Sequence, residues 1–125
     1  MGTNFCFRHD FRYGEIYEIH IAKISGGWLP LFESHRNIKS VKDIKAAYDT
    51  GQFEIVDEYD KKYSWEQFEE RVLNWNKDNP QALSHILPPK DFTKEQVIQY
   101  YGTRYESSMF FTDDEGYEFC NREFE

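Results

Sequence analysis

The sequence has no long apolar run, and it contains only two cysteines and four prolines. No window approaches the ~18 apolar residues of a membrane-spanning helix, and the first residues do not resemble a secretion signal. We therefore expect a cytoplasmic protein. In that compartment Cys6 and Cys120 are expected to stay reduced, with Cys120 as a buried thiol.

Positive charge is also scarce. The chain carries 15 Lys and Arg residues against 23 Asp and Glu, which gives a formal net charge of -8. Proteins that grip a phosphate backbone do so with Lys and Arg, so direct nucleic-acid binding is disfavoured. The negative charge suits solubility alone, a basic partner surface, or competition with nucleic acid for a basic groove.

Aromatic residues are abundant in place of aliphatic ones. They make up 18% of the 125 residues, with 9 Tyr, 11 Phe and 3 Trp. Such a composition predicts a core built mainly from rings, which pack in specific geometries. The length fits a single domain over residues 1–125.

Hydrophobic patterning predicts several strands. The run at 16–24 and the run at 28–34 flank Gly26 and Gly27, which indicates an antiparallel hairpin. A further strand is predicted within 52–63, with a turn near Asp60. Two more are expected on either side of the polar turn at 113–116.

Three short helices are predicted from their capping residues. One begins at Ser40 and ends at Gly51. A second begins at Ser64, where Gln67 completes a capping box, and a third begins at Thr93 in the same way. The fold class expected is α+β, a mainly antiparallel sheet with about three short helices packed on it, stapled by zinc in the N-terminal region.

The zinc expectation comes from one cysteine and three histidines. Cys6 and His9 are two residues apart, a spacing at which a tight turn points a thiolate and an imidazole at one ion. His20 falls on the first predicted strand of the hairpin and His35 just after the second, and four such donors complete a closed, structural site. The alternative is ordinary packing of Cys6, an exposed His9 and a hydrogen-bonded His20. Spacing alone favours this alternative.

Four tracts of the chain resemble a family of small uncharacterised phage and prophage proteins. They are "MGTNF" at the start, "HIAKISGGW" at 20–28, "IVDEYDKKYSWEQFEERV" at 55–72 and "DDEGYEFCNREF" at 113–124. Members open with a similar Met-Gly-Thr-Asn start, often carry a Cys-x-x-Cys pair, and have a histidine before a Gly-Trp and a second histidine after it. The resemblance spans nearly the whole chain.

The resemblance implies a metal-ligand set. Carried over by position, Cys6 and His9 take the two cysteine places, and His20 and His35 take the two histidine places. The chain departs from the pattern where His9 replaces a cysteine and where His35 lies further from Trp28. Family tails with Ser in place of Cys120 argue against Cys120 as a ligand.

The same resemblance implies phage biology in a bacterial host cytosol. The leading hypothesis is a non-enzymatic binding inhibitor, most concretely an anti-CRISPR protein that docks on an RNA-guided Cas nuclease and blocks target-DNA loading. Tyr59 and Tyr117 are candidate aromatic anchors. The candidate acidic contacts fall in two clusters, one of Asp57, Glu58 and Asp60 and one of Asp113, Asp114, Glu115 and Glu118. The alternative for each cluster is a solvated turn.

Two other functions remain open. One is a metal-dependent hydrolase at the N-terminal site, with Asp10 or Glu18 as general base. It finds little support, because the sequence shows no Ser-His-Asp pattern or phosphate-cradling glycine loop. The other is a structural or regulatory phage protein with no host-defence target.

Overall fold

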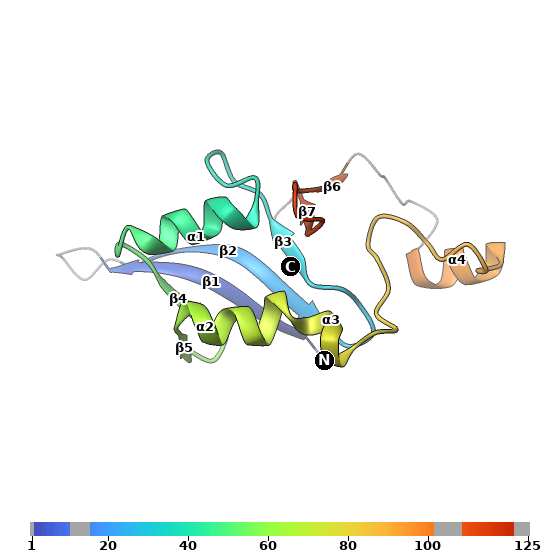
Figure 1. Ribbon diagram of the computed structural model, residues 1–125, viewed down its shortest axis with the longest axis horizontal. Helices are drawn as coiled ribbons and strands as arrows, with labels where there is room; N and C mark the ends of the chain where they lie inside the picture. The colour runs from blue at the N-terminus through green and yellow to red at the C-terminus, as the bar shows by residue number, and fades with distance from the viewer. Residues whose placement is uncertain (1, 11–15, 102–108, 122–125) are drawn as a thin grey trace.

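A computed structural model describes residues 2–10, 16–101 and 109–121 of the protein. Seven strands in this part form one sheet with the order β5-β4-β1-β2-β3-β7-β6 (Figure 1). Every neighbouring pair is antiparallel except β3 and β7, which run parallel. The strands are β1 Gly2–Asp10, β2 Ile16–Ser25, β3 Leu31–Glu33, β4 Glu54–Asp57, β5 Lys62–Tyr63, β6 Phe110–Thr112 and β7 Glu118–Cys120.

Helices cover one face of this sheet. Figure 1 shows α1 (Val41–Asp49) and α2 (Trp65–Phe68) on the same side of β1 and β2. A π-helical turn, η1 (Glu69–Leu73), and the short α3 (Trp75–Asp78) continue directly from α2. The fourth helix, α4 (Lys94–Tyr101), lies away from α1 and α2. The predicted α+β class is therefore confirmed, with a larger sheet and one more helix than expected.

The core between sheet and helices is built from rings, as the composition predicts. Five of its side chains are phenylalanines with no exposed surface, namely Phe5, Phe7, Phe32, Phe68 and Phe119. Phe5 meets Phe68 of α2 edge to face, with ring centroids 5.7 Å apart, and Phe32 stacks on Phe119 of the neighbouring strand at 5.3 Å. The first contact joins the sheet to its helical cover, and the second joins two neighbouring strands of the sheet.

A bulge in β2 decides which side chains face the helices. Phe5 pairs with Ala22, but the next residue, Cys6, pairs with His20, so Ile21 is the extra residue. In a regular strand His20 would share the face of Ala22, because side chains alternate with period two. The bulge instead places His20 on the face of Cys6, opposite the helices.

Most elements begin and end where their sequence signals indicate. The β2–β3 hairpin is confirmed, with Ala22 paired to Phe32, and Ser40 caps α1 through the backbone N–H of Asp43 at 3.1 Å. Ser64 and Gln67 form the predicted capping box. The helix beyond it is not regular, since the N–H of Asn74 bonds the carbonyl of Glu69 across a π turn.

One prediction about the N-terminal segment is wrong. Cys6 and His9 do not share a tight turn, because both lie inside the nine-residue strand β1. That strand sits between β2 and β4 near the middle of the sheet. Across the described ranges, no helix combines the length and apolar character needed to cross a membrane.

Candidate functional site

His9 lies apart from the other predicted metal ligands. Three positions along a strand reverse the side-chain direction, so His9 points to the helix-covered face with Phe7, while Cys6 points to the other. Its Nδ1 is 2.5 Å from the carbonyl oxygen of Gln52, and its ring lies 5.8 Å from that of Phe53. This geometry separates His9 from Cys6 by the thickness of the sheet.

The remaining predicted ligands lie nearer to one another. Cys6 and His20 are direct cross-strand partners, and the His35 Nε2 lies 2.6 Å from the carbonyl oxygen of His20 and 3.3 Å from a carboxylate oxygen of Glu33. Since a carbonyl can only accept, this Nε2 carries a proton and donates it. Among the residues described, no three His, Cys, Asp or Glu side chains are arranged to hold a metal ion. The arrangement does not support the expected zinc staple.

Both cysteines are buried thiols, and in the described part of the chain neither forms a disulfide. Burial raises the pKa of the Cys6 thiol to about 11, and the nearby carboxylates of Glu18 and Glu33 act in the same direction. The thiolate is the form that attacks electrophiles and binds metals. In this arrangement Cys6 is therefore a protonated packing residue at neutral pH.

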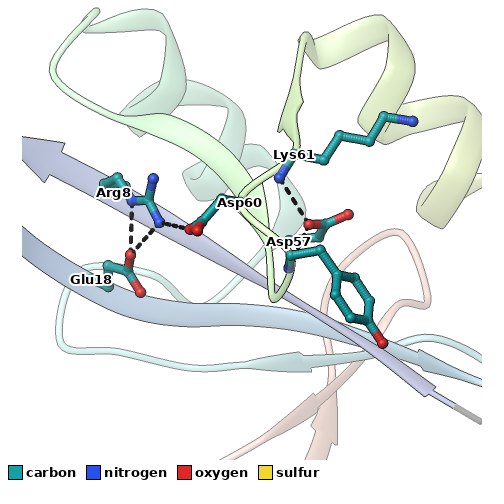
Figure 2. A network of polar contacts seen from close by, with 6 residues as sticks. Arg8, Glu18, Asp57, Asp60 and Lys61 are labelled. Atoms are coloured by element: carbon teal, nitrogen blue, oxygen red, sulfur yellow. Dashed lines mark hydrogen bonds and ion pairs between the residues drawn. The ribbon is translucent and has the colours of Figure 1, made fainter.

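In the first acidic cluster, the Asp57 carboxylate forms hydrogen bonds within the β4–β5 hairpin. Its carboxylate accepts hydrogen bonds from the backbone N–H groups of Tyr59 and Lys61, at 2.8 and 3.0 Å, and from the Tyr63 hydroxyl at 2.9 Å. Figure 2 shows the Lys61 ammonium pointing away from the carboxylate that its N–H reaches. Burial alone would raise the pKa of Asp57, but these hydrogen bonds outweigh it and lower the pKa. Asp57 is only 7% exposed.

The exposed carboxylates of the same turn are partly neutralised. Arg8 binds both Asp60 and Glu18 (Figure 2), and these bonds raise the pKa of the guanidinium. Asp60 also adopts a left-handed conformation, with φ of 65°, that closes the turn. Glu58 is exposed and accepts one long bond, 3.4 Å, from the N–H of Asn4.

In the second cluster, two carboxylates hold elements together. Asp113 accepts from the N–H groups of Glu115 and Tyr117 within the β6–β7 turn, and from the N–H of Val41 at the start of α1, at 2.9 Å. Glu118 is 6% exposed and accepts from the Ser84 hydroxyl and, at 2.7 Å, from the N–H of His85. Glu118 thus anchors the segment before α4 to the sheet.

Two carboxylates that face solvent, those of Glu69 and Glu115, act electrostatically on Tyr117. Asp114 and Glu115 are exposed at the tip of the β6–β7 turn, and Glu69 is exposed on η1. Burial raises the pKa of Tyr117, and the charges of Glu115, Asp113 and Glu69 raise it further. Within the described ranges, the carboxylates of Glu69 and Glu115 take part in no ion pair. We call Glu69, Asp113, Asp114, Glu115 and Tyr117 the acidic face.

Glu69 is the member of this face that sequence reasoning missed. The capping box at Ser64 predicts a helix whose apolar stripe contains Phe68 and Val72, so Glu69 is expected on its exposed side. Nothing in the sequence says that this side lies beside a turn more than forty residues later in the chain. That neighbourhood depends on the parallel pairing of β3 with β7.

The chain was compared with protein families, with curated proteins and with solved structures. No protein family model, curated protein sequence or solved structure matches the chain.

Proposed function

We propose that this protein is a phage-encoded binding inhibitor of a bacterial defence complex, most concretely an anti-CRISPR protein. In this proposal the acidic face docks on a basic groove of an RNA-guided Cas nuclease and blocks the loading of target DNA. The observation that carries it is the β6–β7 turn, where the exposed Asp114 and Glu115 stand beside Asp113, whose carboxylate accepts from the N–H of the half-buried Tyr117. The phage origin rests on the sequence resemblance alone.

The charge distribution supports a basic partner. RNA-guided nucleases hold nucleic acid in positively charged channels. A protein of net charge -8 is attracted to such a channel over long range, and a local group of carboxylates determines which surface meets it. An aromatic residue at the centre of a charged surface is a common binding anchor.

The rigidity of the acidic face also supports this function. Asp113 joins the β6–β7 turn to the first turn of α1, and Tyr117 packs edge to face on the core residue Phe32 with ring centroids 5.6 Å apart. Side chains held in this way lose little conformational freedom on binding, so the entropy cost of binding offsets less of the interaction energy.

The β4–β5 turn is a weaker candidate for the same role. Asp57 is buried, and Arg8 already binds Asp60 and Glu18, so the partner would have to displace an existing ion pair. Tyr59, at 75% exposure, remains available there as an aromatic anchor. We therefore place the contact at the β6–β7 turn.

A DNA-loading assay tests the proposal. Purified Cas nuclease with its guide is incubated with the protein before or after target DNA, and DNA binding and cleavage are measured. We expect inhibition only when the protein is added first. The triple variant Glu69→Gln, Asp114→Asn, Glu115→Gln should lose it.

A second triple variant is the matched control. Asp78→Asn, Asp91→Asn and Glu95→Gln remove the same charge from exposed positions outside the acidic face. This variant should inhibit like the wild type. Equal loss in both triple variants would assign the effect to net charge, and no inhibition of any representative nuclease would contradict the anti-CRISPR assignment.

A further inference from the structure

A pocket of about 270 Å³ opens beside the acidic face. It lies between the β6–β7 turn, the segment that enters β3, and the end of η1. Pockets for drug-sized ligands are roughly 300–1,000 Å³, so this volume suits one long side chain better than a free metabolite. The lining residues that matter here are Leu29, Leu73, Asn74, Asn76, Glu115 and Tyr117.

The pocket lining has an apolar part and a polar part. Leu29, the buried Leu73 and the Tyr117 ring supply apolar and aromatic surface. Asn74, Asn76 and Glu115 are polar lining residues, with amide and carboxylate side chains, from two different elements. A ligand that fits both parts has a long aliphatic stem and a cationic end with several donors.

We propose that this pocket receives an arginine side chain of the protein partner. The proposal rests on the binding function proposed above and names its central contact. The guanidinium is planar and offers five N–H donors in a fixed fork, so it can reach a carboxylate and amide oxygens together. It also stacks on aromatic rings and is more weakly hydrated than the lysine ammonium.

Charge complementarity selects this occupant over an anionic or a purely apolar one. The pocket shares Glu115 and Tyr117 with the acidic face, where the charges of Glu69 and Asp113 also act on the tyrosine. The second glutamate of the lining, Glu118, already accepts from Ser84 and His85. Glu115 is therefore the carboxylate assigned to the incoming cation.

Two short peptides test the proposal directly. Each has four basic residues separated by glycines, one with arginine and one with lysine, and they carry equal charge. Binding is followed by NMR through the side-chain amide signals of Asn74 and Asn76. We expect the arginine peptide to bind about tenfold more tightly, as one added hydrogen bond to a charged group implies.

Variants separate the pocket from general electrostatic attraction. Glu115→Gln should remove the preference for arginine, and Asn76→Trp, which replaces a lining residue by a much larger one without changing charge, should do the same. Glu95→Gln, an equal charge loss on α4, should keep it. Equal affinity for both peptides, or an arginine preference that survives Asn76→Trp, would overturn the pocket assignment.

The nuclease assay distinguishes failure of this inference from failure of the proposed function. If the protein blocks DNA loading and Asn76→Trp blocks it equally well, the pocket assignment is wrong while the inhibitor function stands. If the protein does not block DNA loading but the arginine preference is present and pocket-dependent, the pocket assignment holds and the partner is a different arginine-bearing protein.

Discussion

The hydroxyl of Tyr63 donates a hydrogen bond of 2.9 Å to the buried carboxylate of Asp57. With the N–H groups of Tyr59 and Lys61, it makes three donors converge on one side chain at the start of the β4–β5 turn. A residue that sequence reasoning assigns to partner binding is thus part of the internal structure of the turn.

Replacing this carboxylate should destabilise the fold. We expect Asp57→Asn to lower the free energy of unfolding by about 1–3 kcal/mol, because buried donors lose a charged acceptor. Tyr63→Phe should cost about 1 kcal/mol, and Glu58→Gln, at an exposed neighbouring position, should change stability by less than about 0.5 kcal/mol. Denaturant unfolding measures all three, and a neutral Asp57→Asn would refute the assigned role.

Acidification should reveal the same contact. The pKa of Asp57 lies below its ordinary value of 3.8 in the folded protein. Its contribution to stability is therefore complete above that ordinary value and is lost as the pH falls toward the folded pKa. Asp57→Asn should lack this part of the acid transition, which melting curves between pH 5 and about pH 2 would detect.

The thiol of Cys6 should react slowly. A pKa raised from 9.0 to about 11 lowers the thiolate fraction near pH 8 about a hundredfold, and burial restricts access as well. In a Cys120→Ser background, iodoacetamide should alkylate Cys6 at least about a hundredfold more slowly in the folded protein than in denaturant. The rate in the folded protein should rise with pH. Equal rates in both states would contradict the burial of Cys6.

His85 should make stability depend on pH near neutrality. Its ring stacks on Trp28 at 5.0 Å and its Nε2 donates to the carbonyl of Leu29 at 2.9 Å. Burial lowers the pKa of His85 below 6.5, although the hydrogen bond to Leu29 and the charge of Glu118 oppose this, and Lys23 lowers it further. Stability from the neutral ring is complete above pH 6.5 and declines as the pH falls toward the folded pKa.

The variant His85→Gln isolates that effect. It removes the titrating group, so its melting temperature should fall less than that of the wild type between pH 7 and about pH 5. An NMR titration of the ring protons measures the pKa itself. A value at or above 6.5 in the folded protein would contradict the burial described for the ring.

Zinc binding stays a prediction of the sequence. The structure indicates which of the predicted histidine ligands a metal ion could use. If the purified protein contains zinc by elemental mass spectrometry, His9→Ala should leave the metal content unchanged, because His9 faces the side of the sheet opposite Cys6. His20→Ala should lower metal content and melting temperature together. Loss of zinc in His9→Ala would show that β1 departs from the described register.

Local sequence signals anticipated much of the secondary structure. Ser40 and Ser64 cap helices where expected, and the β2–β3 pairing follows the two glycines between the apolar runs. These features depend on residues only a few positions apart. Each side chain satisfies the backbone next to it, and this can be deduced without knowledge of the rest of the fold.

The strand β1 could not be deduced in the same way. Its residues mix Phe5 and Phe7 with charged and polar neighbours, and the Cys6 and His9 spacing suggests a turn. Pairing with β2 and β4 on both sides makes it a strand. Long-range hydrogen bonds override a local signal here, as is common for β structure.

By itself the sequence determined the ring-built core, the negative charge and the positions of the helix caps, because composition and local hydrogen bonding fix these. The tertiary structure decided which charges are free to act. The bulge at Ile21 turned His20 away from the helix-covered face, Arg8 paired with Asp60 of one acidic turn, and the parallel β3–β7 pair brought the other turn near Glu69. Such neighbourhoods arise only when distant segments pack together, so no short stretch of sequence contains them.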